Sequence, residues 1–469
     1  MSVKSVLISP KTIAVVGASE DIRKPGGKTL ENLLRYNFEG EIYPVNPKYK
    51  SIMGLKCYPT ILDIPKPIDV AILAIPSHIV LKAIEQCIIK KVKYVVIYSS
   101  GFSELLDPEK VKLEEKLRNM VKNTSTRLIG PNSEGYMIPL TNTYAIFSSA
   151  PEASPISGEV AFISQSGALG ASLITRFWEL GYGISCFIST GNEADMTFVD
   201  FIKIVLDDPN TKAVTGFIEQ IRKSQRFIEI SKKALKRRKP IIVFKAGKSE
   251  KGKFSARTHT GAVAGSYEIY NAVLKQYGVI EVDELEDLIY ASIALAWQPI
   301  PKGDRLGFIT ISGGSCSVMA DLCEKLKLVV SDLSENTIKK LKKILPEFAI
   351  AKKPLDITGG ALSKLGDIMC ECLYAMAEDD NVDMVIIGLT TLAGVWAEDA
   401  MSKLIPAIKD VNQNHQKPVY FWWSIARSVI NKHINRLLAN KIPYSYPEKA
   451  VKAAYYASLY GRYLKRFIN

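Results

Sequence analysis

Short runs of consecutive apolar residues recur along the chain, and between them lie stretches in which apolar residues return every three or four positions. Buried parallel strands give continuous apolar runs, and amphipathic helices give the longer spacing. Most of the runs end in Gly, Pro, Ser or Asn, as strands do before a loop. The pattern therefore predicts an α/β fold in which helices cover parallel sheets. The clearest runs are at residues 12–19, 41–47, 69–76, 94–100, 126–132, 160–167, 183–192, 213–221, 240–247, 306–312, 382–391 and 417–424.

Two interruptions divide this alternation into three parts. The stretch from residue 139 to about residue 158 is rich in Pro, Ser and Thr and has no period, so we interpret it as a linker. A second break follows at residues 298–305. A chain of 469 residues has room for roughly two to four domains. We therefore predict three doubly wound, Rossmann-like or flavodoxin-like domains in series, at residues 1–138, 158–297 and 304–469.

Composition narrows the class of protein. Hydrophobic residues make up 47% and charged residues 23%, which is typical of a globular protein. No apolar run approaches the roughly 20 residues of a membrane span, and the N-terminal apolar stretch is broken by Pro10 and Lys11, so we expect a cytoplasmic protein without a signal peptide. The 7 cysteines include no C-x-x-C pair and no zinc spacing, which predicts reduced, buried thiols and no structural metal.

The net charge of +13 raises the question of nucleic acid. The lysines are spread over helix faces, and no basic stripe with interleaved aromatic residues is present, so we expect no nucleic-acid partner. A positive protein nevertheless attracts phosphate-rich ligands.

The loops of the first predicted domain favour a phosphorylated ligand. Gly17 and Ser19 follow the first strand in a turn that lacks a complete G-x-G-x-x-G. The second strand ends at Pro47 and Lys48, where a dinucleotide-binding protein has an acidic residue that holds a ribose. Lys48 would attract a phosphate instead, which argues against an NAD-dependent oxidoreductase. A solvated turn at Lys48 is the alternative.

The second predicted domain has two polar loops between a strand and a helix. Such loops surround phosphate or carboxylate groups with N–H groups and hydroxyls, although ordinary helix capping is the alternative interpretation. Their candidate ligand-binding residues are Ser164, Gln165, Ser166 and Gly167 in one loop and Gly191 and Asn192 in the other.

Glu219 and His259 form the candidate catalytic pair. Glu219 ends a strand, and His259 lies in the loop after the next strand, among small residues that include Thr260 and Gly261. A neutral imidazole is a nucleophile near pH 7 when a carboxylate on one ring nitrogen fixes its tautomer. The pair therefore suggests a phosphohistidine. A surface loop with an incidental histidine is the alternative.

Nearly the whole chain resembles the α subunit of an NDP-forming acyl-CoA synthetase, the archaeal ADP-forming acetyl-CoA synthetase type, which is related to succinyl-CoA synthetase. "IAVVGAS", "YPVNPK", "AILAIP", "SSGFSE" and "LIGPNSEG" resemble its CoA-binding domain. "GEVAFISQSGALG", "ISTGNEAD", "GFIEQI" and "THTGAVAGS" resemble its second domain, and "ISGGSCSVMADLCE" with "KPLDITGG" its third.

This resemblance implies acyl-CoA + ADP + phosphate ⇌ acid + ATP + CoA, through an acyl phosphate and a phosphorylated His259 that Glu219 orients. It implies that CoA binds at Gly17, Ser19, Lys48, Pro76, Ser100, Gly101 and Asn132. It also implies that acyl phosphate forms near Ser164, Gln165, Ser166, Gly167, Gly191, Asn192, Thr260 and Gly261. Ser133, Ser100 and Thr197 depart from the residues that are common in the family, which leaves the acyl preference open.

Three α/β domains use the whole chain and leave no ATP-grasp domain, and no G-x-x-x-x-G-K-[ST] is present. We therefore expect a separate ATP-grasp β subunit that binds ATP or ADP with Mg²⁺, in an α2β2 assembly. The other expected substrates are phosphate and a small carboxylic acid. The choice among acetate, branched, aryl and hydroxy acids, and between ADP and GDP, stays open. A CoA-binding or CoA-sensing protein without turnover is the main alternative; a protein acetyltransferase fusion would need a domain for which no residues remain.

Overall fold

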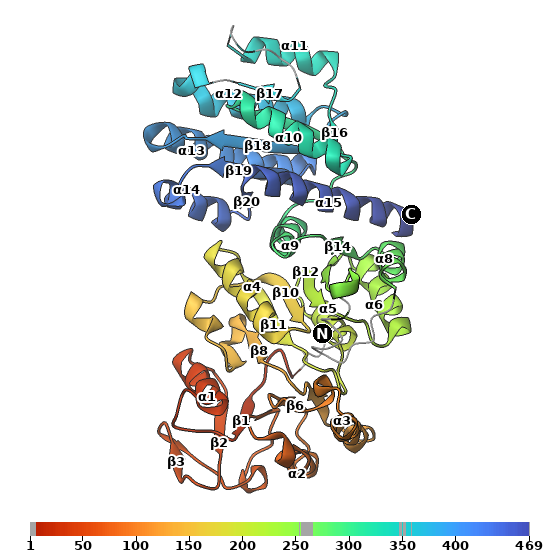
Figure 1. Cartoon of the computed structure of the whole chain (residues 1–469). Helices are drawn as coiled ribbons and strands as arrows, with labels where there is room; N and C mark the ends of the chain where they lie inside the picture. The colour runs from red at the N-terminus through yellow and green to blue at the C-terminus, as the bar shows by residue number, and fades with distance from the viewer. Residues whose placement is uncertain are drawn as a thin grey trace. The chain divides into compact units, whose positions relative to one another are not determined.

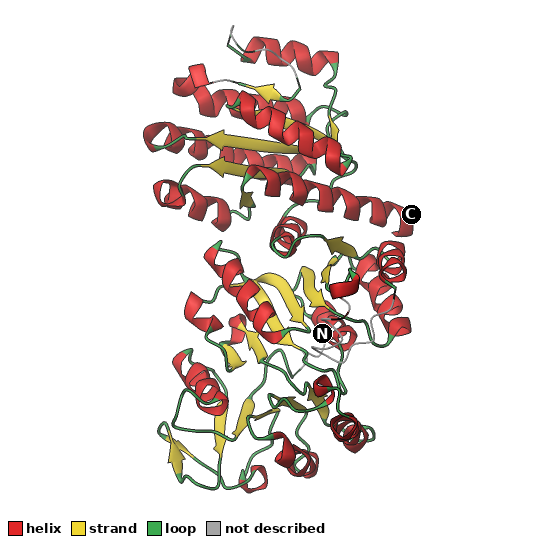
Figure 2. Cartoon of the chain, in the orientation of Figure 1, coloured by secondary structure: helices red, strands yellow, loops and turns green. Residues whose placement is uncertain are grey.

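The computed structural model describes residues 6–252, 254, 266–346, 349, 353–357 and 359–468. Its contacts divide the chain into two compact units, Met1–Val282 and Asp283–Asn469. Helices and strands alternate in both units (Figures 1 and 2). The three large sheets are mostly parallel, so the predicted α/β class is confirmed.

The first sheet is parallel and has the strand order β2-β1-β5-β6-β7. Its apolar runs are buried on both faces, as in the fully buried β5. The chain places β2 on one side of β1 and β5 on the other, and ligands bind at the carboxyl ends of strands at such a switch point. The elements are β1 (Thr12–Val16), α1 (Pro25–Arg35), β2 (Glu41–Val45), β3 (Ser51–Ile52), β4 (Leu55–Lys56), β5 (Val70–Leu73), α2 (Ser77–Ile89), β6 (Tyr94–Ile97), α3 (Pro108–Val121) and β7 (Arg127–Ile129).

The second sheet belongs to the same unit and has the order β14-β13-β12-β10-β11-β8-β9. Its first five strands in this order are parallel, and their switch point lies between β10 and β12. The elements are β8 (Gly135–Ile138), β9 (Thr143–Ile146), β10 (Ser157–Ser164), α4 (Gly167–Glu179), β11 (Ile184–Ser189), α5 (Phe198–Asp207), β12 (Ala213–Ile218), α6 (Ser224–Lys236), β13 (Ile241–Lys245), α8 (Tyr267–Gln276) and β14 (Ile280–Val282).

The stretch that we interpreted as a linker contains part of this sheet, so that interpretation is wrong for residues 143–146. These residues form β9, which pairs antiparallel with β8 and is buried along its whole length. The amide of Asn32 in α1 donates to the carbonyl of Ile146 over 2.8 Å and fixes the hairpin against the first sheet. A four-residue strand with both faces buried has no alternation, which is why its polar and proline-rich flanks concealed it.

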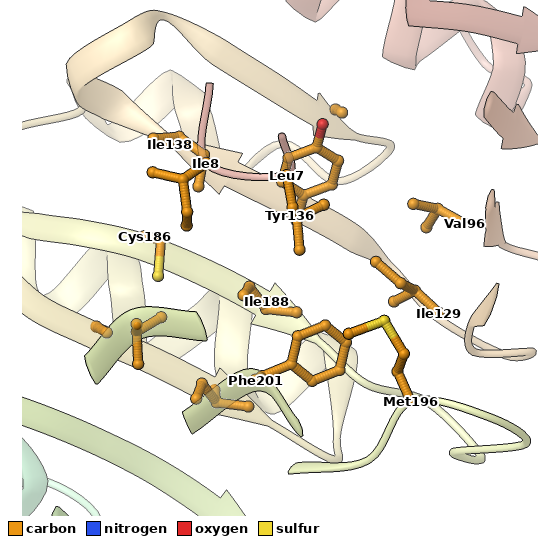
Figure 3. Packing of buried hydrophobic residues seen from close by; sticks show 14 of the residues in the cluster. Leu7, Ile8, Val96, Ile129, Tyr136, Ile138, Cys186, Ile188, Met196 and Phe201 are labelled. Atoms are coloured by element: carbon orange, nitrogen blue, oxygen red, sulfur yellow. The ribbon is translucent and has the colours of Figure 1, made fainter. Parts of the chain in front are cut away.

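A shared hydrophobic core joins the two sheets of the first unit. Val96 in β6 and Ile129 in β7 belong to the same buried cluster as Ile188 in β11 and Phe201 in α5 (Figure 3). Leu7, near the N-terminus, is fully buried in this cluster. Burying each such side chain stabilises the fold by roughly 1.5–3 kcal/mol. The core therefore holds the loops at the ends of β7, β10 and β11 in fixed positions.

The second unit contains the third sheet, of order β16-β15-β18-β19-β20, with β17 paired to β15. α9 begins this unit and packs on α15. The fully buried Asp287 of α9 accepts hydrogen bonds from Lys449, Lys452 and Tyr456 of α15. The elements are α9 (Asp287–Trp297), β15 (Arg305–Thr310), α10 (Gly313–Leu326), β16 (Val329–Val330), α11 (Glu335–Ile344), β17 (Leu355–Asp356), α12 (Leu365–Ala377), β18 (Met384–Thr390), α13 (Gly394–Asp410), β19 (Val419–Ser424), α14 (Arg427–Ala439), β20 (Tyr444–Ser445) and α15 (Pro447–Ile468).

The cysteines form no disulfide and are buried, apart from the half-buried Cys370. Burial raises the pKa of Cys87 and of Cys186 to about 12, which keeps both thiols protonated. Within the described part of the chain, every helix is too short or too polar to cross a bilayer.

Candidate functional site

The residues predicted to bind CoA lie along one edge of the first sheet, because each follows a strand and the strands are parallel. The loop after β1 and the loop after β5 flank the switch point. Lys48 and Ser100 are exposed at this edge, whereas Ser19 is buried. In sheet order the residues are Lys48 after β2, Gly17 and Ser19 after β1, Pro76 after β5, Ser100 and Gly101 after β6, and Asn132 after β7.

Gly17 permits close packing at the switch point. Its φ is +86°, and a Cβ there would lie 2.3 Å from the carbonyl oxygen of Ala74, which follows β5. The first turn of α1 approaches Gly17 from the other side, since a Cβ on Gly26 would lie 2.2 Å from the Gly17 carbonyl oxygen. Only glycine fits the left-handed conformation and this separation. Glycine at this position therefore lets the loop after β1 pack directly against the loop after β5.

Asn46 fixes the loop that carries Lys48. Its side-chain amide donates to the Ala18 carbonyl over 2.8 Å, and its side-chain oxygen accepts from the Lys48 N–H over 3.0 Å. The two bonds join the end of β2 to the loop after β1. Lys48 is thus an exposed charge on a backbone that is held in place.

Two carboxylates, Glu104 after β6 and Glu114 in α3, lie close together at this edge. Glu104 accepts hydrogen bonds from the N–H groups of Gly101 and Phe102, and the buried Glu114 accepts from Ser103. Both carboxylates also accept from the side-chain amide of Asn192, over 2.6 and 3.0 Å.

These bonds connect the first sheet to the loop after β11, because Asn132 also donates to the side-chain oxygen of Asn192 over 3.3 Å. Gly191 lies against the same turn, since a Cβ on it would be 2.2 Å from the Pro131 carbonyl oxygen. The turn after β7 and the loop after β11 are therefore packed and hydrogen-bonded together. Asn192 donates to protein carboxylates here, so its contribution to the site is to join the two sheets' loops.

The side-chain amide of Gln165 is the centre of the second sheet's switch point. Its oxygen accepts from the N–H groups of Glu219 over 2.6 Å and Gln220 over 3.0 Å. Its nitrogen donates to Glu193 over 2.8 Å and to the Gln220 carbonyl over 2.7 Å. Every hydrogen-bonding position of the amide is used. Gln165, after β10, therefore fixes the backbone at which Glu219 leaves β12.

Glu193 determines how this amide is oriented. Its carboxylate also accepts from the Thr190 hydroxyl over 3.1 Å and the Phe198 N–H over 2.9 Å. Because the Phe198 N–H donates to the same carboxyl oxygen, that oxygen acts as an acceptor, so the nitrogen of Gln165 faces it while the oxygen of Gln165 faces the Glu219 N–H. Burial raises the pKa of the Glu193 carboxyl, and the Arg222 guanidinium lies 4.0 Å away.

Glu219 is buried at the carboxyl end of β12, between the loops that follow β10 and β13. His259, Thr260 and Gly261 belong to the loop after β13 but lie outside the described residues. The contact between His259 and Glu219 thus stays a prediction.

The loop after β10 ends in the first turn of α4. The buried Ser164 donates through its hydroxyl to the Ser166 carbonyl over 2.6 Å. Ser166 is the N-cap of α4, but its side chain makes no cap hydrogen bond. Gly167 begins the helix next to Glu134 and Ser189. The N–H groups of a first helical turn without a side-chain cap attract an anion.

A cavity of about 610 Å³ lies elsewhere in the first unit, between α5, α6 and the start of β7. It contains none of the predicted site residues. Charged groups on its wall pair with one another: Arg226 with Asp200 over 3.2 Å, and Lys233 with Asp207 over 3.3 Å. The predicted site residues therefore lie at the carboxyl edges of the two sheets and outside this cavity.

Two family models match the first unit and the beginning of the second. Residues 11–139 match the model described as a CoA binding domain, and residues 157–295 match the succinyl-CoA ligase like flavodoxin domain. The fold and these matches place the chain among proteins that combine a CoA binding domain with a succinyl-CoA ligase like flavodoxin domain.

Known relatives narrow the class. The α subunit of the ADP-forming acetate–CoA ligase II of Pyrococcus furiosus is 38% identical over 451 residues, which are 95% of each chain. The ADP-forming acetate–CoA ligase of Methanocaldococcus jannaschii is 40% identical over 352 residues; the match covers 75% of this chain but 49% of that protein, so the chain corresponds to about half of that longer relative.

A solved structure agrees over the full length. The dinucleotide-forming acetyl-CoA synthetase 1 of Candidatus Korarchaeum cryptofilum, in complex with phosphate and ADP, has a TM-score of 0.89 at 34% identity and covers 100% of this chain and 99% of its own. The chain belongs to the family of the ADP-forming acetate–CoA ligase α subunits. The resemblance inferred from its motifs is confirmed.

Four carboxylates at the site were not among the predicted residues. They are Glu104, Glu114, Glu134 and Glu193. Each contacts residues that are far away in the sequence; Glu193, for example, bonds to Gln165, which lies 28 positions before it. The available signal was position, since Glu104, Glu134 and Glu193 each follow a strand end within quoted motifs.

Proposed function

We propose that this chain is the α subunit of an ADP-forming acyl-CoA ligase that interconverts acyl-CoA, ADP and phosphate with the free acid, ATP and CoA. The observation that carries this proposal is the pair of switch points in the first unit. One has the loops of a CoA-binding domain, and the other has a buried glutamate whose backbone is fixed by Gln165. The loops after β6 and β7 of the first sheet are hydrogen-bonded to the loop after β11 of the second sheet through Asn192.

The proposed reaction begins at the N-terminus of α4. A phosphate oxygen attacks the thioester carbonyl carbon, the C–S bond breaks, and CoA leaves as a thiolate. A nitrogen of His259 then attacks the phosphorus of the acyl phosphate, and the acid leaves as a carboxylate. A terminal oxygen of ADP finally takes the phosphoryl group from His259. Glu219 orients the imidazole and stabilises its charge, as a carboxylate beside a nucleophilic histidine does.

A separate ATP-grasp β subunit supplies the ADP site and its Mg²⁺ in this proposal, in an α2β2 assembly. Within the described residues, no group of three or more His, Cys, Asp or Glu side chains is arranged to hold a metal ion. The chain's own ligands are then CoA, phosphate and a small carboxylic acid.

Reconstitution tests the proposal. We expect the purified chain to bind CoA in a calorimeter but to make no ATP from acetyl-CoA, ADP and phosphate. Addition of an ATP-grasp β subunit should start ATP synthesis. ATP formation by the chain alone would contradict the two-subunit form. CoA binding without ATP synthesis by the complex, over a panel of acyl-CoA substrates, would instead indicate a non-catalytic CoA-binding protein.

A further inference from the structure

Glu134 is a buried carboxylate that the proposed reaction does not use. It precedes β8, and its side chain is 9% exposed. Its N–H donates to the Ser189 hydroxyl over 3.0 Å, and its side chain is hydrogen-bonded to Ser148. The second carboxyl oxygen, Oε2, has no hydrogen-bond partner among the described residues. Buried polar atoms are nearly always bonded, so an unbonded carboxyl oxygen indicates a partner outside the described residues, such as a bound ligand.

Oε2 is directed at the first turn of α4. A Cβ on Gly167, the first residue of that helix, would lie 2.9 Å from Oε2 and 2.7 Å from the Glu134 Cβ. The Ser166 side chain leaves this helix end uncapped. A 13-residue helix has its positive end here, next to a carboxyl group that forms no hydrogen bond to it.

Few charges surround Glu134. The elements packed against it contribute the Ser189 hydroxyl at the end of β11, the Ser148 hydroxyl after β9, Gly167 in α4 and the Tyr98 hydroxyl after β6. Tyr98 is the titratable group among these, and its pKa is raised by burial and by the charge of Glu134. No ion pair between Glu134 and a basic side chain occurs in the described residues. Burial raises the pKa of Glu134.

We propose that Glu134 contacts the oxyanion that binds at the N-terminus of α4, and that its carboxyl holds a proton while the anion is bound. An ionised carboxylate repels an oxyanion within hydrogen-bond distance, whereas a proton on the carboxyl turns the contact into a hydrogen bond. Protonated Oε2 donates to an oxygen of the anion and thereby gains its missing partner. The identity of the anion as phosphate or acyl phosphate rests on the proposed function; the chemistry recognised here is that of a tetrahedral oxyanion.

The sign of the pH dependence follows directly. Glu134 has a higher pKa in the complex than in the free chain, so binding takes up a proton. Above the free pKa, affinity falls by up to roughly tenfold for each pH unit until the pKa of the complex is reached. Phosphate itself titrates near neutral pH, whereas sulfate does not, so sulfate is the suitable probe.

The test is titration of the full chain with sodium sulfate by calorimetry, across roughly pH 6 to 8, in two buffers of different ionisation heat. We expect an uptake that approaches one proton per sulfate, and weaker binding at higher pH. Glu134→Gln keeps the size and a hydrogen-bond donor but cannot titrate, so it should bind sulfate with no uptake and little pH dependence. Glu152→Gln, an exposed carboxylate paired with Lys28 over 2.8 Å, is the matched control and should behave as the wild type.

Three results would overturn the inference. The first is sulfate binding to the wild type without proton uptake, which needs no variant and so does not depend on how Glu134→Gln folds. The second is unchanged uptake in Glu134→Gln. The third is no sulfate binding by a chain that binds CoA. None of these contradicts the proposed reaction, because ATP synthesis by the reconstituted complex is measured separately.

Discussion

The carboxyl edges of the first and second sheets differ in how much of their chemistry faces solvent. At the first sheet, the side chains of Lys48 and Ser100 are exposed, and Gly17 allows the loop after β1 to pack closely against the loop after β5. At the second sheet, Gln165 is 5% exposed and Glu219 is 6% exposed. The same strand order, 2-1-3-4-5 among the parallel strands, thus supports an open edge and a closed one.

This difference suggests that the two edges of one unit have different functions, ligand recognition at the open edge and catalysis at the closed edge. An open edge with a fixed lysine suits recognition of a large, charged ligand that extends into solvent. A closed edge excludes water, where hydrogen bonds and charges act in a low dielectric and are already oriented before a reaction begins. Substitutions at the second edge should therefore change rates, and substitutions at the first edge should change CoA affinity.

The largest effect of a conservative substitution is expected for Glu219→Gln. The amide cannot offset the positive charge that develops on the imidazole, and orienting groups of this kind contribute about 10²–10⁴-fold. We expect phosphorylation of the chain by acyl phosphate to slow by this factor, in rapid-quench measurements, with the Kd for CoA unchanged. The control is Glu229→Gln, an exposed carboxylate on α6. Equal rates for the two variants would remove Glu219 from the mechanism.

Substitution of Gln165 should lower kcat by a smaller factor, and a second substitution at Glu193 should partly restore kcat. Gln165→Glu places a carboxylate against Glu193, where the wild-type side chains are hydrogen-bonded over 2.8 Å. A charge-assisted hydrogen bond is worth roughly 1.5–3 kcal/mol, so kcat should fall about ten- to hundredfold while the KM for CoA is unchanged. The exchanged pair, Gln165→Glu with Glu193→Gln, returns one donor and one acceptor. A pair no faster than Gln165→Glu alone would show that the two side chains do not act through each other.

Lys48→Ala tests the open edge. Because Lys48 stands where a phosphate is expected, its loss should weaken CoA by about ten- to hundredfold and dephospho-CoA much less. Calorimetry with both ligands measures the difference, and Lys50→Ala, an exposed lysine two residues away, is the control. Equal losses of affinity for CoA and dephospho-CoA would assign Lys48 to the diphosphate or to no contact. A fall in kcat would contradict the expectation that substitutions at the first edge change CoA affinity and not the rate.

The fold was predictable from the sequence wherever burial is continuous. β5 and β18 are continuous apolar runs, as expected for strands that are buried on both faces of a parallel sheet. The alternation of such runs with amphipathic stretches predicts the α/β class. β9 was not predictable, because four residues between prolines have no period, and its burial depends on contacts with α1 and β8.

The sequence predicted where the site residues lie better than it predicted what each side chain does there. Gln165 was expected to bind a ligand from its place after a strand, yet its amide is fully occupied by Glu219, Gln220 and Glu193. Those bonds join residues 28 to 55 positions apart, so no local spacing reveals them. Glu134 likewise gains significance only because α4, from a later part of the chain, begins opposite it.

The central claim is that the closed edge transfers a phosphoryl group through His259. The most direct measurement is mass spectrometry of the chain after brief incubation with acyl phosphate, or with ATP and the β subunit. We predict one phosphoryl group on His259, which is lost in acid and stable in base, as a P–N bond is and a serine ester is not. His259→Asn should remove it, whereas His415→Asn in the second unit should not. Phosphate found only on Ser164 or Ser166, or full ATP synthesis by His259→Asn, would contradict the account.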